Sequence, residues 1–146
     1  MEVRRAGEDD VDALVRLRAT WREHEAPGEF ASVFHDWFRR EQPSRWWWIA
    51  TDDDDAVGMV NLKLFQRMPS PDRPHSRWGY LSNLFVAPER RGQGLGSAMV
   101  AALISEARAA GLARVVLSPS ELSIPLYARH GFRPADDLLI LPLVDD

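Results

Sequence analysis

Residues 84–97 read LFVAPERRGQGLGS, and this stretch decides the fold more than any other part of the chain. An apolar, strand-like run ends at Val86, a turn with alternating glycines follows, and a helical pattern starts near Leu95. Glycine lacks a Cβ, so its backbone can approach a ligand closely. The first N–H groups of a helix have no partners within the helix and carry partial positive charge. The stretch therefore predicts a cradle for a phosphate or pyrophosphate, to which Arg90 and Arg91 can add charge.

The spacing of the glycines limits which phosphate motif this can be. A P-loop needs Gly-Lys-Ser/Thr, and no lysine follows these glycines. The dinucleotide fingerprint G-x-G-x-x-G fails in both registers, because Ser97 and Met99 stand where its third glycine would be. What remains is the pattern Arg-x-x-Gly-x-Gly over residues 91–96.

Outward from this stretch, the chain reads as helices and strands in one domain over residues 1–146. Apolar residues at helical spacing predict a helix from Glu8 to a stop at Pro27, and further helices over 29–41, 95–110 and 121–130. Strands are predicted over 2–6, 46–50, 56–65, 78–86, 115–117, 132–133 and 138–143, with a loop over 66–77. Hairpins mixed with helical crossovers predict an α/β (α+β) fold, a mixed sheet with helices on both faces.

Composition narrows the function classes. Hydrophobic residues make up 45% and charged residues 27% of the chain, as in an ordinary globular domain. No apolar run approaches the roughly 20 residues of a membrane span, and residues 1–5 lack a signal peptide's apolar stretch, so we expect a cytoplasmic protein with no membrane partner. The absence of cysteine excludes a thiolate site, and four scattered histidines offer no metal-ligand spacing. A net charge of −4 argues against a nucleic-acid partner.

The Arg-x-x-Gly-x-Gly pattern resembles the acyl-CoA-binding motif of the GNAT superfamily of N-acyltransferases. The run LYARHGF over 126–132 is similar to the same family's C-terminal tyrosine-helix-Gly-Phe signature. The resemblance is strongest across 79–132, weak across 1–78, and agrees with the predicted order of elements. It implies a mixed sheet of about six to seven strands flanked by four helices, splayed between the fourth and fifth strands.

The resemblance also implies a role for particular residues. The pantetheine arm of acetyl-CoA, the co-substrate, would pair with the backbone of Leu84, Phe85 and Val86. The general acid that protonates the leaving thiolate would be Tyr127, whose reference pKa of about 10 suits that task. Ser120 stands where many relatives place an asparagine that contacts the pantetheine. Backbone N–H groups would bind the pyrophosphate from Arg91, Gly92, Gln93, Gly94, Leu95, Gly96 and Ser97.

One departure from the family concerns the general base. Many relatives carry a glutamate in the strand before the glycines, whereas this chain has Ser82 followed by Asn83, and neither is a good base. A lysine-like amine with a pKa of about 10.4 then needs about 4–5 kcal/mol for deprotonation at pH 7. A more acidic amine would reduce that cost, and otherwise a base must act from elsewhere, directly or through water. Candidates by residue type, none of them assigned, are His75, Asp72, His35, Glu29 and Glu121.

These features predict an N-acetyltransferase that moves an acetyl group from acetyl-CoA to a primary amine by direct attack in a ternary complex. The acceptor stays open among small amines, amino acids, peptide N-termini, protein lysines and antibiotic amino groups. The oligomeric state also stays open, with a homodimer as one option because dimers are common in the family. The alternatives are a CoA-binding sensor that has lost catalysis, and a nucleotide-binding domain with the same anion cradle.

Two further features bear on the acceptor. Aromatic residues 46–48 fall on both faces of one strand, where burial is expected, and one of them could contact an amine through a cation–π interaction. Glu23, Glu25 and Glu29 lie at the junction of the first two helices, which borders the acceptor site in the family. They would attract a cationic amine, although a solvated helix end is the simpler interpretation.

Overall fold

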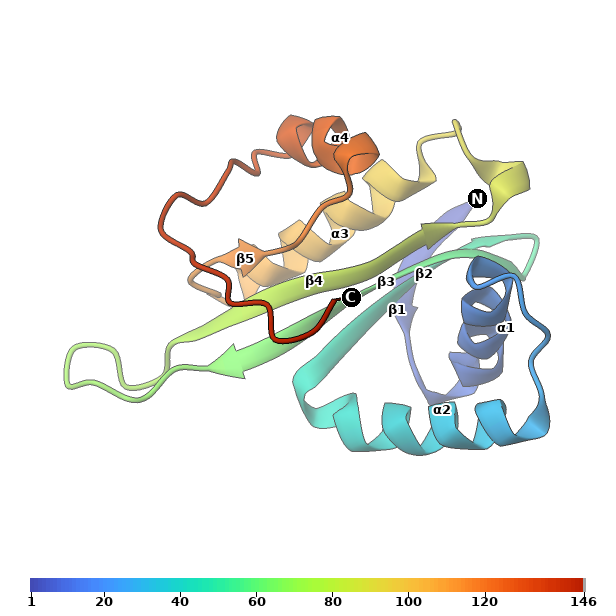
Figure 1. Cartoon of the computed structure of the whole chain (residues 1–146), viewed down its shortest axis with the longest axis horizontal. Helices are drawn as coiled ribbons and strands as arrows, with labels where there is room; N and C mark the ends of the chain where they lie inside the picture. The colour runs from blue at the N-terminus through green and yellow to red at the C-terminus, as the bar shows by residue number, and fades with distance from the viewer. Residues whose placement is uncertain (146) are drawn as a thin grey trace.

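The computed structural model, which describes residues 1–145, is built around a five-stranded sheet in the order β1-β2-β3-β4-β5 (Figure 1). Helices α1 and α2 lie against one face of this sheet, and α3 and α4 lie on the other (Figure 1). Short 3-10 turns precede α1, β2, α3 and α4. The elements are β1 (Glu2–Ala6), α1 (Val11–Trp21), α2 (Gly28–Glu41), β2 (Arg45–Asp52), β3 (Asp55–Gln66), β4 (Arg77–Val86), α3 (Leu95–Ala109), β5 (Val115–Val116) and α4 (Ile124–Arg129).

The sheet is mixed, because its first four strands are antiparallel and β5 is parallel to β4. β5 pairs with β4 at Gly79 and Tyr80, close to the start of β4. The pairing ends there, so the rest of β4 runs on to Val86 without β5 beside it. The end of β4 therefore has no partner strand on this side, and the splay between the fourth and fifth strands that the resemblance implied stays a prediction.

Side-chain alternation along the central strands divides the interior into two cores, one on each face. In β2, Trp47 packs with the α1–α2 core and Trp48 with the α3–α4 core. In β3, Met59 belongs to the first core and Val60 to the second. Period-two alternation requires this, since neighbouring side chains point to opposite faces of a strand. The sheet therefore separates the environment of α1 and α2 from that of α3 and α4.

The expected six to seven strands are wrong, because the sheet of residues 1–145 has five. Residues 132–133 and 138–143, predicted as strands, have no strand structure. An apolar run forms a strand only where a neighbouring strand can accept and donate backbone hydrogen bonds. Pro134 and Pro142 have no N–H to donate to such a neighbour. The apolar side chains of 138–143 lie exposed instead, with Leu139 fully so, whereas Phe132 packs against the core.

The helix predicted from Glu8 is a 3-10 turn (Glu8–Asp10) followed by α1, which ends at Trp21. The helix predicted over 121–130 divides in the same way, into a 3-10 turn over Glu121–Ser123 and the short α4. No helix within residues 1–145 has the length and apolar character needed to cross a membrane.

Replacement of Leu103 by alanine tests the packing of α3 on the sheet. Leu103 is 0% exposed, so Leu103→Ala should lower the free energy of unfolding by about 2–5 kcal/mol through lost burial and a residual cavity. Leu122 is 95% exposed and is the matched control, with an expected change within about 0.5 kcal/mol. Urea denaturation measures both, and equal losses would contradict this core.

Candidate active site

A bulge distorts β4 immediately before the residues predicted to meet the coenzyme. Phe85 pairs with Met59 and Ser82 pairs with Asn61, so Asn83 and Leu84 together face a single residue of β3. Asn83 has a φ of 60°, in the left-handed region that asparagine tolerates better than most residues. A bulge bends a strand and increases its twist. Beyond the bulge, β4 pairs with β3 again at Phe85 and Val86, with its register shifted by one residue.

A buried polar network holds this bulge from the β3 side. The Asn61 side chain is 0% exposed, and its amide nitrogen donates to Asn83 Oδ1 at 2.8 Å. Ser82 Oγ donates to Asn61 Oδ1 at 3.1 Å, and Arg45 donates to the same oxygen. Ser82, at the position where relatives carry a glutamate, thus supports the bulge through a hydrogen bond.

Glu41 closes the network through two cationic side chains. Its Oε1 accepts from Arg45 Nη2 at 2.8 Å and from Lys63 Nζ at 3.0 Å. Burial by itself would raise the pKa of Glu41, but the hydrogen bonds and charges of Arg45 and Lys63 outweigh it and lower the pKa. The carboxylate therefore stays ionised and paired at neutral pH.

The glycine turn leaves a row of backbone donors free. Gly92 and Gly94 have φ angles of 78° and 81°, and the first backbone hydrogen bond of the helical turn runs from Ala98 N–H to Gly94 O. Within residues 1–145, the N–H groups from Gly92 to Ser97 donate to no other group. Unpaired donors at a helix N-terminus favour an anion. The geometry thus provides the cradle that the sequence predicted.

The two arginines of the turn are held differently. Arg91 Nε donates to Val86 O at 3.1 Å, which ties the turn to the end of β4 and leaves Arg91 exposed beside the free N–H groups. Arg90 forms an ion pair with Asp52 at 2.6 Å and so anchors the turn to the β2–β3 hairpin. Of the two arginines, Arg91 is therefore the one whose charge is not paired with a carboxylate and is available for a ligand.

α4 contributes two contacts at the same end of the sheet. Tyr127, 7% exposed, lies in the core with Leu95, and partly buried Leu84 and Val86 pack against that core. The Ser97 hydroxyl and His130 Nε2 are 2.7 Å apart, which joins the first turn of α3 to the end of α4. This contact was missed by the sequence analysis, and no spacing rule would have found it.

The Tyr127 hydroxyl is not satisfied by a neighbour. The ring packs edge-on against Phe132 with centroids 5.6 Å apart, and the hydroxyl forms no hydrogen bond within residues 1–145. Because residues 1–145 contain no buried side-chain oxygen without a hydrogen bond, the Tyr127 hydroxyl must reach solvent-accessible space. Burial of the ring raises the pKa of Tyr127. The phenol is thus protonated at neutral pH and available to donate.

The remaining predicted residues lie outside this cluster. Ser120 is exposed, and its hydroxyl donates to Ser123 Oγ at 3.0 Å. Of the candidate bases, His35 is paired with Asp12 at 2.7 Å. The others are all exposed: Asp72 and His75 in the 66–77 loop, Glu29 at the start of α2, and Glu121 before α4.

A cavity of about 260 Å³ lies on the α1–α2 side of the bulge. Asn83 connects this cavity to β4, and Trp47 is the member of the aromatic triplet that reaches it. Its lining within residues 1–145 includes none of the candidate bases. The lining residues are Arg18, Phe30, Val33, Phe34, Trp37, Trp47, Met59 and Asn83.

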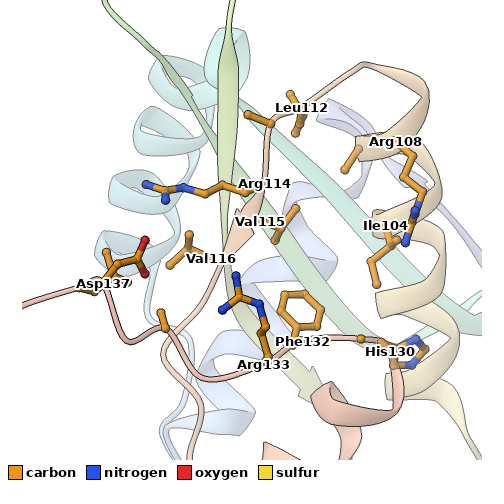
Figure 2. Close-up of a pocket in the computed structure, with 15 residues that line it drawn as sticks. Ile104, Arg108, Leu112, Arg114, Val115, Val116, His130, Phe132, Arg133 and Asp137 are labelled. Atoms are coloured by element: carbon orange, nitrogen blue, oxygen red, sulfur yellow. The ribbon is translucent and has the colours of Figure 1, made fainter.

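A larger cavity of about 420 Å³ lies between α3, β5 and the C-terminal segment. Figure 2 shows Arg108, Arg114 and Arg133 around it. Its lining includes neither Tyr127 nor any residue of the glycine turn. This larger cavity therefore contains none of the site residues that the sequence predicted. Residues 1–145 contain no group of three or more His, Asp or Glu residues placed to hold a metal ion.

Replacement of Gly94 by alanine tests the backbone of the turn. An added Cβ would meet nothing within 4 Å at either Gly94 or Gly28, but only Gly94 has a positive φ. Gly94→Ala should therefore cost about 1–2 kcal/mol of stability through backbone strain. Gly28→Ala is the control and should change stability by less than about 1 kcal/mol. Equal changes in urea denaturation would contradict the left-handed turn.

Comparison with known proteins agrees with this geometry. A sequence profile described as "Acetyltransferase (GNAT) family" matches residues 11–132. The chain is 37% identical over 87 residues to a glucosamine 6-phosphate N-acetyltransferase of Trypanosoma brucei brucei. That match covers 60% of this chain and spans 57% of the relative's length.

Two solved structures cover almost the whole chain. An acetyltransferase of Trypanosoma brucei is 26% identical with a TM-score of 0.76, covering 97% of this chain and 99% of that one. A predicted acetyltransferase of Clostridium acetobutylicum, solved with acetyl-CoA, is 24% identical with a TM-score of 0.75, covering 97% and 96%. With the profile match over most of its length, the bulged end of β4 that β5 does not cover and the glycine turn before α3, this chain belongs to the GNAT family of acetyltransferases.

Proposed function

We propose that the protein transfers an acetyl group from acetyl-CoA to a primary amine within a ternary complex. The observation that carries the proposal is the row of free N–H groups from Gly92 to Ser97 at the end of β4, with the Tyr127 phenol in the adjoining core. The row suits the pyrophosphate of the coenzyme. The backbone of 84–86, which β5 does not cover, suits the pantetheine amides.

In the proposed reaction the neutral amine attacks the thioester carbonyl carbon. A C–N bond forms, the C–S bond breaks, and the leaving thiolate takes the proton of the Tyr127 hydroxyl. The proton lost by the amine passes to solvent, from which Tyr127 is protonated again. The products are the amide and CoA-SH, so atoms and charges balance.

The acceptor is proposed to bind in the 260 Å³ cavity beside the bulge. The lining of this cavity supports an amine that arrives already neutral. Because no candidate base lines the cavity, the fraction of neutral amine is set by the acceptor itself. An α-amino group with a pKa near 8 needs only about 1–1.5 kcal/mol for deprotonation at pH 7, against about 4–5 kcal/mol for a lysine-like amine. The proposal therefore favours amines of low pKa.

A CoA-binding sensor is the second candidate, and the missing base at Ser82 is the observation that favours it. Thiol release from acetyl-CoA across a panel of amines separates the two. Tight CoA binding with no turnover on any amine would favour the sensor. The cytoplasmic location, the single domain and the homodimer stay predictions.

Removal of the Tyr127 hydroxyl should lower turnover. Tyr127→Phe keeps the buried ring but removes the proton donor, so kcat should fall by about 10²–10⁴ while the Kd for CoA changes little. Tyr80→Phe is the matched control, because the Tyr80 hydroxyl bonds to Ser118 away from the turn. Thiol release gives kcat and calorimetry gives Kd. Unchanged turnover in Tyr127→Phe would remove this residue from the acid role.

The pH dependence of kcat/KM should follow the acceptor. Below the pKa of the acceptor amine, kcat/KM should rise about tenfold per pH unit, because only the neutral amine attacks. Since the pKa of Tyr127 is raised above its ordinary value of about 10, the acid stays protonated and no decline is expected below pH 10. With two acceptors of different pKa, the bend of the profile should move with the acceptor. A fixed bend near pH 6–7 would reveal a base on the enzyme.

A further inference from the structure

We propose that Arg18 binds an anionic group of the acceptor, so that the acceptor is an amine with an apolar body that also bears a carboxylate or a phosphate. The inference rests on the proposed function and names the substrate class of that same site. It starts from a side chain to which the sequence analysis gave no role.

Arg18 is a partly buried cation without an anionic partner. It lies in the last turn of α1 and lines the 260 Å³ cavity. Within residues 1–145 its guanidinium forms no ion pair and no hydrogen bond, and it lies over the Trp21 ring at 4.7 Å. By contrast, two other partly shielded arginines have a carboxylate partner: Arg45 lies 2.8 Å from Glu41, and Arg90 lies 2.6 Å from Asp52.

The surroundings of Arg18 make an anion favourable. Burial, with a smaller effect from the neighbouring charge of Arg22, lowers the pKa of Arg18. The Arg18 nitrogens nevertheless reach accessible space, where a ligand can meet them, and no carboxylate within residues 1–145 is paired with their charge. An acidic group on the ligand would supply a counter-ion, and the planar guanidinium fits a carboxylate or a phosphate through paired hydrogen bonds.

The rest of the cavity selects an apolar ligand body. Apart from Arg18 and Asn83, the lining consists of apolar side chains, and four of these, Phe30, Phe34, Trp37 and Trp47, are aromatic. The hydroxyl groups of a sugar would lose their hydrogen bonds to water against such a lining without replacement. The cavity therefore suits an aromatic or aliphatic amine acid better than the sugar phosphate named for the trypanosomal relative.

The position of Arg18 allows both ends of such a ligand to be used. Trp21, under the Arg18 guanidinium, stacks on Phe85 of β4 with centroids 5.3 Å apart. Asn83, at the bulge, lines the same cavity. An acceptor whose acid group lies on Arg18 can thus direct its amine towards the end of β4, where the thioester is proposed to lie. The cavity volume of about 260 Å³ suits a small molecule or the terminal residue of a peptide.

Acceptor kinetics test the inference with matched probes. The probes are L-phenylalanine, its 1-aminophosphonate analogue and 2-phenylethylamine, which lacks an acid group, with glucosamine 6-phosphate as the sugar arm. In every comparison of acceptors kcat/KM is expressed per neutral amine, so that differences in amine pKa do not enter. On this scale the acid-bearing aromatic amines should exceed 2-phenylethylamine by about tenfold or more, as for a hydrogen bond between charged groups. The better of the carboxylate and the phosphonate identifies the acid group.

In Arg18→Gln this preference should fall at least tenfold, with the KM for acetyl-CoA unchanged. Arg18→Lys keeps the positive charge but lacks the planar guanidinium with its paired hydrogen bonds. It should therefore keep part of the preference for acid-bearing amines. Arg16→Gln is the matched control, because Arg16 is an exposed arginine of the same helix. A preference that survives in Arg18→Gln, or glucosamine 6-phosphate as the best acceptor, would overturn the inference.

A binding measurement separates this inference from the proposed reaction. 3-Phenylpropionate carries the acid and the ring but no amine, and 3-phenylpropanol lacks the charge. Quenching of tryptophan fluorescence should show binding of the acid at least tenfold tighter than the alcohol, and Arg18→Gln should abolish the difference. Equal binding of the two, or no effect of Arg18→Gln, would overturn the Arg18 site even if amines are acetylated. Loss of turnover with this binding intact would instead count against the reaction.

Discussion

The end of β4 is the constraint on which the rest of the molecule depends. β5 pairs only with the start of this strand, and the bulge at Asn83 turns the remainder out of register. Backbone groups that a regular sheet would use for its own ladder are thereby left for a ligand. The hydrogen bonds of Asn61 and the attachment of Arg91 to Val86 hold that arrangement on its two sides. The proposed acetyl-donor site is thus made mainly of backbone.

Much of the region from β4 to α4 could be predicted from sequence, because its signals are local. Glycines at 92 and 94 mark positive φ angles, and the strand before them and the helix after them follow from periodicity. Tyr127 was identified through a short signature whose residues are contiguous. In each case the information that fixes the structure lies within a few residues, as turn and helix-start rules require.

The features that sequence did not predict depend on contacts between distant residues. The bulge needs the register of β3 against β4, and the Ser97–His130 contact joins two helices. The apolar run over 138–143 has the composition of a strand. Whether it forms one depends on whether the fold brings a partner strand beside it, which its own residues do not show. The unpaired state of Arg18 is likewise a property of its surroundings, because the chain has many arginines and only the fold shows which of them lack a carboxylate.

The separation of the interior by the sheet has a consequence for how this protein can diversify. The residues around the glycine turn and Tyr127 pack with α3 and α4, whereas the small aromatic cavity belongs to α1 and α2. Substitutions that reshape one layer are screened from the other by the strands between them. If the proposed sites are right, new substrate ranges can therefore evolve around α1 and α2 while the proposed acetyl-donor site beside α3 and α4 is inherited intact.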